Sequence, residues 1–108
     1  MPARPPVIPP VVRISGRPWR TVQMDLTDQE AQGLSDAGNG TIAIHETHES
    51  LFAEQDTVLH EVMHSVFRQQ GRPYTQAEER FVTALTPGLL GVLHDNPELV
   101  KYLLRKRP

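Results

Sequence analysis

The segment between Ser50 and Gln70 constrains the fold of this 108-residue chain more than any other. Its apolar residues recur at helical spacing, and Gly71 with Pro73 supplies a stop signal, so we predict a helix over this segment. These apolar residues are Leu51, Phe52, Val58, Leu59, Val62, Met63, Val66 and Phe67. Because they surround most of the helix circumference, the helix should be largely buried.

Within this helix the letters HEVMH place two histidines four residues apart, with a glutamate directly after the first. Residues four apart share one helix face, so His60 and His64 can point their imidazoles at a single ion. Glu61 lies about 100° around the helix from His60, beside the ligands rather than among them. A carboxylate there could accept the proton of a metal-activated water, as hydrolysis requires.

A short motif also arises by chance, and two histidines on a helix often form only a partly exposed face. Three polar side chains on a buried apolar helix, however, would be unfavourable unless one partner satisfied them together. The chain has no cysteine, so a metal would be bound by imidazole and carboxylate alone. We therefore expect Zn²⁺ as the cofactor, with His60 and His64 as two of its ligands.

The third ligand should come from the next helix, which we expect to begin near Thr75, to bend at Pro87 and to end near His94. The extended metzincin motif is excluded, because Phe67 and Gln70 stand where it has glycine and a third histidine. The inward stripe of the second helix is predicted to be Phe81, Val82, Leu85, Leu89 and Val92.

Glu78 falls within this stripe, and we predict it as the third metal ligand. An alternative stays open, because TQAE from Thr75 to Glu78 also fits a capping box. Glu78 would then bind the backbone amide of Thr75, and Glu79, about 100° further around the helix, would be the better ligand.

The segment before residue 50 shows strand patterns. VVRI and WRTVQMDL flank the turn-type cluster SGRP and indicate a β-hairpin, and TIAIH at 41–45 indicates a third strand. TDQE at 27–30 fits the capping box of a brief helix. We expect the strand 41–45 to be the edge along which an extended peptide substrate binds. The predicted fold class is α+β, with a small antiparallel sheet of about three strands, the motif helix and two to three further helices.

Length predicts one domain over residues 11–104, preceded by a proline-rich flexible arm at 1–10 and followed by a basic tail at 105–108. The net charge of −2 indicates no general affinity for nucleic acid or membranes, and the basic tail is typical of a solvated terminus. No run has membrane-spanning length, and prolines interrupt the N-terminal apolar stretch, so we expect a cytoplasmic protein. The oligomeric state is left open.

Other polar residues are candidates for supporting roles. A donor to the oxyanion could be His45, His48, Tyr74 or His94, and a partner of the ligand imidazoles could be Asp56, Thr57 or Asp95. Each also has an ordinary surface, capping or turn role, and the sequence does not choose between the two.

HEVMH followed one helix later by EERFVTAL resembles the zincin metallopeptidases of the glutamate-ligand type. The stretch from TVLHEVMHSVF to LTPGLLGVLHDNPELVKYLL is similar to very small zinc metallopeptidase-like proteins of phages and prophages, and more distantly to the ImmA/IrrE group, which acts on repressors. This resemblance, over about residues 41–104, implies a minimal zincin fold with His60, His64 and Glu78 as ligands and Glu61 as base. Met63 stands where the ImmA/IrrE group usually has glycine, and the alanine-asparagine pair after the ligand glutamate is missing.

Two functions follow as expectations. The first is a zinc peptidase that hydrolyses a protein or peptide substrate with Glu61 as the base. The second is a non-catalytic, zinc-containing module of phage origin that binds and sequesters a host factor. Closed metal coordination, with no position left for water, would favour the second.

Overall fold

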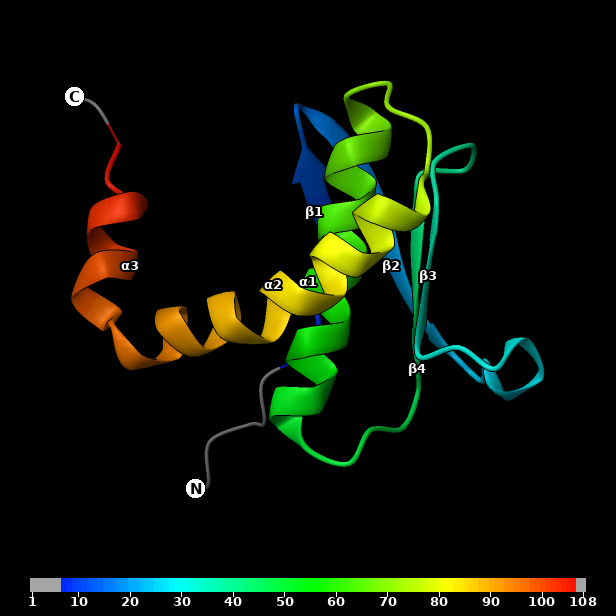
Figure 1. Ribbon diagram of the computed structural model, residues 1–108, viewed down its shortest axis with the longest axis horizontal. Coiled ribbons are helices and arrows are strands. Elements are labelled where there is room, and N and C mark those ends of the chain that lie inside the picture. Colours follow the sequence, from blue (N-terminus) through cyan, green and yellow to red (C-terminus); the bar gives the residue numbers. More distant parts are fainter. Residues whose placement is uncertain (1–6, 107–108) are drawn as a thin grey trace.

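The computed structural model describes residues 7–106 and shows an α+β fold, which confirms the predicted class (Figure 1). One sheet is combined with three α-helices. In chain order the elements are β1 (Val11–Ile14), β2 (Arg17–Met24), the 3₁₀ turn η1 (Thr27–Gln29), β3 (Gly33–Asp36), β4 (Thr41–His45), α1 (Leu51–Gln69), α2 (Gln76–Asp95) and α3 (Pro97–Leu103). Among the described residues, no helix has the length and apolar character needed to cross a membrane.

The sheet has the strand order β1-β2-β4-β3. The predicted hairpin is β1 and β2, and its turn residues Ser15 and Gly16 both have positive φ, at 51° and 82°, as a tight hairpin turn requires. The expected three strands are therefore present, but β3 adds a fourth. The pairing of β2 with β4 is parallel, whereas β3 and β4 are antiparallel, so the sheet is mixed rather than antiparallel throughout.

Strand β4 lies inside the sheet, with β2 on one side and β3 on the other. Both of its edges are hydrogen-bonded, so the expectation that residues 41–45 form the substrate edge is wrong. The outer strand on that side is β3. Its sequence, GLSD, lacks the apolar alternation by which a strand is recognised, which explains why it was missed.

The turn before β3 also differs from its prediction. The helical segment at 27–29 is brief, as expected, but no side chain caps it from the predicted position. Asp25 instead accepts hydrogen bonds from the backbone N–H and the hydroxyl of Thr27. The capping box at 27–30 is therefore not formed.

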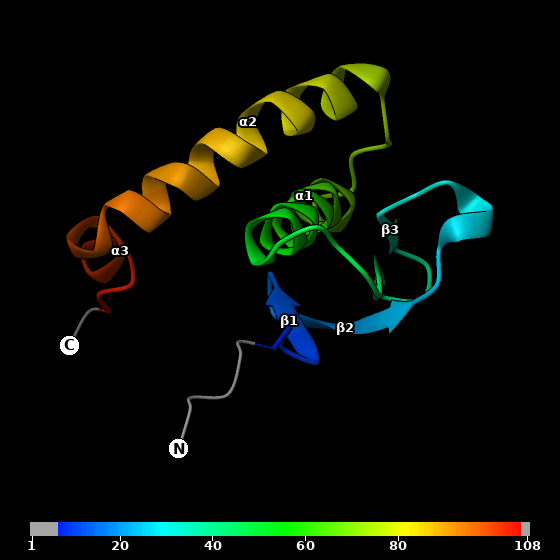
Figure 2. The ribbon, with the colours of Figure 1, turned by 90° about the horizontal axis from the view of Figure 1, so that it is seen from below.

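Helix α1 lies between the sheet and α2, so the domain has three layers (Figure 2). Val58, Val62 and Val66, each four residues from the next, pack against the sheet core. That core consists of Ile14, Trp19, Ile42 and Ile44. The polar face of α1, which carries the two histidines, is turned away from this apolar contact toward α2 and β3.

The buried residues of α1 are Glu61, His64 and Ser65, and all three are polar. Leu51 and Phe52 are 46% and 43% exposed. Most residues of α1 are half-buried, so the helix is less buried than expected, because a small sheet and one crossing helix cover only part of its surface. Ser65 is satisfied by the hydroxyl of Ser35 on β3 at 2.7 Å.

Helix α2 crosses α1 and extends beyond it to α3 (Figure 1). Its bounds match the prediction within a residue or two, and Pro87 lies inside it. Its buried residues, four apart, are Glu78, Val82, Thr86 and Leu90. Phe81, Leu85 and Val92, which were expected inside, are exposed, because α2 is covered along one narrow line only.

The two predicted terminal segments are only partly described. Residues 7–10 form neither helix nor strand, as the proline content predicts, although half-buried Ile8 packs against the core. Residues 1–6 of the expected arm and residues 107–108 of the expected basic tail lie outside the described residues.

Trp19 should be central to stability, because its indole is fully buried and its Nε1–H donates to Oε1 of Gln69 on α1 at 3.1 Å. We expect Trp19→Ala to lower the free energy of unfolding by about 3–5 kcal/mol, measured by urea unfolding followed with far-UV circular dichroism. Met24→Ala, on the same strand but 44% exposed, is the matched control and should lose less than about 1 kcal/mol. Equal losses would contradict this account of the core.

Candidate metal centre

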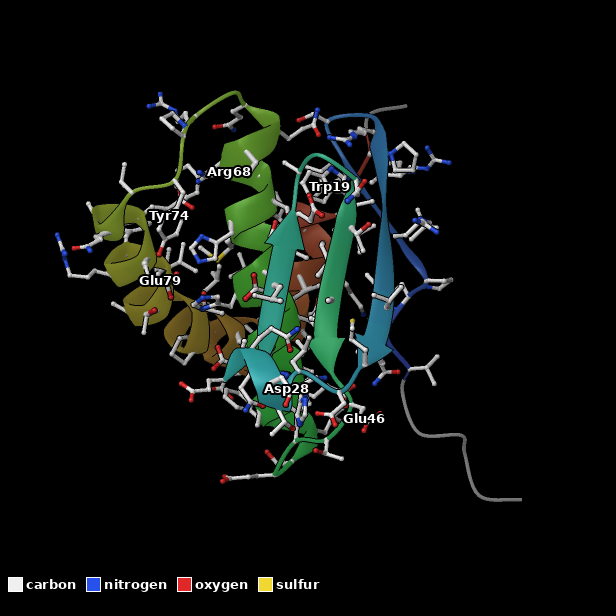
Figure 3. All side chains as sticks on the ribbon, turned by 90° about the vertical axis from the view of Figure 1, so that its right-hand side faces the viewer. Trp19, Asp28, Glu46, Arg68, Tyr74 and Glu79 are labelled. Carbon is white, nitrogen blue, oxygen red and sulfur yellow. The ribbon has the colours of Figure 1, made fainter. Side chains whose placement is uncertain are left out.

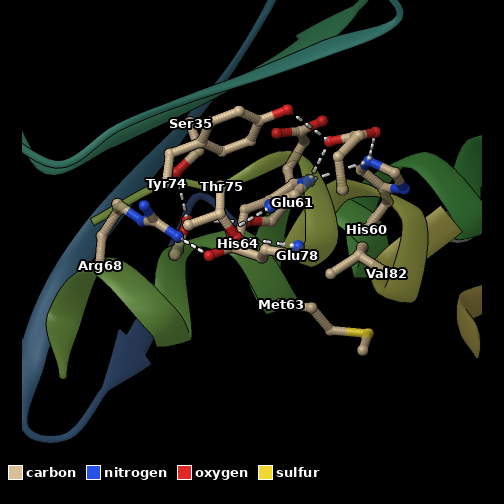
Figure 4. A network of polar contacts seen from close by, with 12 residues as sticks. Ser35, His60, Glu61, Met63, His64, Arg68, Tyr74, Thr75, Glu78 and Val82 are labelled. Atoms are coloured by element: carbon tan, nitrogen blue, oxygen red, sulfur yellow. Dashed lines mark hydrogen bonds and ion pairs between the residues drawn. The ribbon is translucent and has the colours of Figure 1, made fainter. Parts of the chain in front are cut away.

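The imidazoles of His60 and His64 converge as their spacing predicts (Figure 4). Their Nε2 atoms lie 3.2 Å apart. Glu79 of α2 completes the group, with Oε1 at 3.2 Å from Nε2 of His60 and Oε2 at 2.7 Å from Nε2 of His64. These three residues could hold a metal ion.

The spacing of these ligand atoms suits a small cation. In a tetrahedral site with bonds of about 2.0–2.1 Å, neighbouring ligand atoms are about 3.3 Å apart. The three separations given above, 2.7 to 3.2 Å, join two nitrogens and both oxygens of Glu79, and they are somewhat shorter than that edge length. Lone-pair atoms at such distances repel one another unless positive charge lies among them, which a proton or a metal ion supplies.

Glu78, the residue predicted as the third ligand, lies on the other side of the His64 ring. Its buried carboxylate accepts a hydrogen bond from Nδ1–H of His64 at 2.6 Å and pairs with Nη2 of Arg68. This contact leaves Nε2 of His64 free to face His60 and Glu79. The geometry therefore gives the ligand position to Glu79, the alternative that the sequence left open, and gives Glu78 a supporting role.

The capping box proposed for this helix is half formed. Thr75 caps α2 by accepting the backbone N–H of Glu78 at 3.1 Å, but the Glu78 carboxylate does not return to Thr75. One sequence signal could have predicted its true partners. Arg68 follows His64 by one helical turn, so a buried carboxylate facing that side of α1 meets both a cation and an imidazole.

Glu61 is 8% exposed and lies directly against β3. A Cβ atom at Gly33 would come within 2.7 Å of Cγ of Glu61, so glycine permits this close approach. Burial raises the pKa of Glu61 to about 7, with the charge of His64 opposing the shift and that of Glu79 adding to it. A carboxyl group that exchanges its proton near neutral pH has the property that a general base needs.

Glu79 has the opposite electrostatic character. Partial burial disfavours its charge, but the hydrogen bond from Thr83 and the two histidines outweigh this and place the pKa of Glu79 below its usual value. The Thr83 hydroxyl donates to Oε1 of Glu79 at 3.1 Å. Glu79 is therefore ionised at neutral pH, as an anionic metal ligand must be.

A cavity of about 530 Å³ opens beside these residues, and we call it the site cavity. Residues 31–35, which include the start of β3, form one wall, and the metal-centre residues form the other. Arg68 and Tyr74 also line it, and with Glu79 they gather between α1 and α2 in Figure 3. The group therefore has an open side on which a substrate could bind.

Of the four candidate oxyanion donors, Tyr74 lines the site cavity. Its ring centroid lies 5.8 Å from that of His64, and its hydroxyl contacts Oε2 of Glu79 at 3.5 Å. Desolvation and the Glu79 charge raise the pKa of Tyr74, so the hydroxyl keeps its proton. The other three make contacts elsewhere: His45 with the backbone N–H of Leu26, His48 with the carbonyl of His45, and His94 with Gln55.

The three candidate partners of the ligand imidazoles, Asp56, Thr57 and Asp95, are found in other settings. Thr57 donates to the carbonyl of Ala53 within its own helix, and Asp95 is the last residue of α2. Oδ1 of Asp56 is buried without a partner among the described residues. The residue that does orient a ligand imidazole is Glu78.

Protein-family models, curated proteins and solved structures gave no match to this chain. Its resemblance to zincins therefore stays a prediction from the motif, and functional conclusions rest on the chemistry of the site.

The buried Glu61 makes the stability of the metal-free protein depend on pH. Its pKa is about 7 when folded and 4.5 in its ordinary state, so the unfolded chain ionises first as pH rises. The free energy of unfolding should therefore be highest below pH 4.5 and should fall by about 3 kcal/mol as pH rises through 7. Glu61→Gln should abolish this loss in urea unfolding with a chelator present. Glu54→Gln, on the same helix, should retain it, and an identical pH profile for Glu61→Gln and the wild type would refute the assignment.

Proposed function

We propose that this chain is a zinc-dependent peptidase that hydrolyses peptide bonds in a protein or peptide substrate. The observation that carries the proposal is the convergence of His60, His64 and Glu79 beside a buried Glu61 whose pKa is about 7. Two imidazoles and one carboxylate form a ligand set of catalytic zinc sites, which keep a fourth position open. We propose that the protein acts in the cytoplasm.

Zinc is favoured by the chemistry and number of the donors. Two imidazole nitrogens and a carboxylate suit Zn²⁺, whereas Mg²⁺ prefers an octahedral set of oxygen atoms. Three protein ligands next to the site cavity also favour a catalytic rather than a structural ion, because structural sites are closed by a fourth protein ligand.

Zinc bound by this group would act as a Lewis acid, polarising a peptide carbonyl and making a water molecule easier to deprotonate. Glu61, which lines the site cavity, accepts the proton of the attacking water and passes it to the leaving nitrogen. Glu78 and Arg68 keep His64 in one tautomer and orientation. The Tyr74 hydroxyl, in the cavity wall, can donate to the oxyanion.

The position of β3 supports an extended polypeptide as the substrate. Within the described residues β3 pairs only with β4, so its other edge offers unpaired backbone groups. Residues 33–35 of this strand line the site cavity, and Gly33 lies against Glu61. A peptide that added to β3 by main-chain hydrogen bonds would therefore run past the base.

One observation favours a second function, the binding of a partner protein without catalysis. Helices α2 and α3 expose several large apolar side chains: Phe81, Leu85, Val92, Leu99, Tyr102, Leu103 and Leu104. Exposed apolar surface of this extent is typical of interaction sites. Turnover by the zinc-loaded protein separates the two functions.

Zinc affinity should distinguish the two neighbouring glutamates. Glu79→Gln removes a ligand and is expected to weaken zinc binding by more than about 100-fold, whereas Glu78→Gln removes only the support of His64 and should weaken it by about 10-fold. Competition with a chromophoric chelator measures both values. Glu54→Gln should bind zinc as the wild type does, and a larger loss in Glu78→Gln than in Glu79→Gln would reverse the ligand assignment.

Glu61→Gln should retain zinc and lose hydrolysis. We expect kcat/KM to fall by about 10²–10⁴-fold, because the base is lost while the ligands remain. A mixed peptide library with mass-spectrometric detection supplies the substrate, and chelated wild-type protein restored by zinc is the control. Absence of turnover by zinc-loaded wild-type protein would reject the peptidase and leave the binding function.

A further inference from the structure

A second cavity, of about 560 Å³, adjoins the site cavity, and we call it the side cavity. Gln32, Asp56 and Thr57 line both cavities, so the two are adjacent. His45, His48 and Glu49 line the part farther from the metal centre. Asp56 therefore stands at the junction, one helical turn before His60.

The carboxylate of Asp56 has an oxygen atom without a hydrogen-bond partner among the described residues. This atom, Oδ1, is buried. A buried polar atom left in this state is unfavourable, and more so when it is charged. Capping of α1 does not account for Asp56, because Ser50 performs that role by accepting the backbone N–H of Ala53. Because Asp56 lines both cavities, a group bound there could pair with its carboxylate.

The charge around the side cavity has one sign. Its lining includes Glu49 and Asp56 but no lysine or arginine. Residues 21–67 hold nine of the 13 acidic residues of the chain and none of its 11 lysines and arginines. In Figure 3 two of these acidic residues, Asp28 and Glu46, lie at one end of the molecule and Arg68 lies toward the other. A cationic group would therefore be attracted to this end.

We propose that the side cavity receives a positively charged group of the peptide substrate, with Asp56 as its counter-charge. The group is a lysine or arginine side chain or a free N-terminal amine. This inference rests on the proposed peptidase function and specifies its substrate class, basic peptides. One helical turn corresponds to about 6 Å, or about two residues of extended chain, so the cation lies within two or three residues of the scissile bond.

The test measures binding apart from turnover by using zinc-loaded Glu61→Gln protein. Fluorescent peptides with acetylated and amidated ends carry arginine, glutamine or glutamate near the centre, and a fourth carries glutamine with a free N-terminus. Anisotropy should show at least tenfold tighter binding of the arginine or the free-amine peptide than of the blocked glutamine peptide. Which of the two binds more tightly identifies the source of the charge. Equal affinity for all four peptides would overturn the proposal.

Variants in the same Glu61→Gln background assign the preference to Asp56. Asp56→Asn should reduce it to about twofold or less, with zinc content unchanged. Glu54→Gln removes the same charge from the same helix but lines neither cavity, and it should keep the preference. Glu49→Gln, on the exposed loop, should lower it by about two- to threefold and serves if Asp56→Asn does not fold. A preference that survives both cavity variants, or loss of zinc from Asp56→Asn, would refute the role of Asp56.

Wild-type hydrolysis of the same peptides separates this inference from the proposed function. Asp56-dependent preference in binding without turnover would support the side cavity and reject the peptidase. Turnover without any preference for a cationic peptide would support the peptidase and reject the role of the side cavity.

Discussion

The contacts of His64 with two adjacent glutamates are the interaction on which the site depends. Glu78 binds Nδ1 at 2.6 Å and Glu79 lies 2.7 Å from Nε2, so one imidazole of α1 is enclosed by α2. The buried residues of α1 are all polar, which means that charge and hydrogen bonding, as well as apolar contact, fix how the two helices cross. These contacts orient the His64 imidazole in the metal-free protein, so a site that bound an ion there would be preorganised.

The sheet contributes to the same site through its outer strand. Since β4 is enclosed by β2 and β3, the free edge near the histidines belongs to β3, and Gly33 lets that edge approach Glu61. Close packing against the strand is also what desolvates Glu61 and raises its pKa. The position of the proposed base and its proton affinity thus have one structural cause.

Charge is distributed unevenly along this cavity system. Arg68, whose Nη2 pairs with Glu78, lies in the site cavity, whereas Asp56 lies where the site cavity adjoins the side cavity. The proposed catalytic residues lie between them along α1. A substrate that bound as proposed would therefore meet an acidic environment on the Asp56 side, and its own charge would then influence binding.

The sequence by itself determined the hairpin, the limits of α1 and α2 and the shared face of His60 and His64, because turn chemistry and helical periodicity act over a few residues. Only the tertiary structure chose Glu79 over Glu78, since the two differ by about 100° of rotation and the choice depends on the angle at which α2 crosses α1. The same holds for β3, whose polar sequence becomes a strand because β4 offers it an edge. The role proposed for Asp56 likewise depends on its position between two cavities, which are lined by residues distant in the chain.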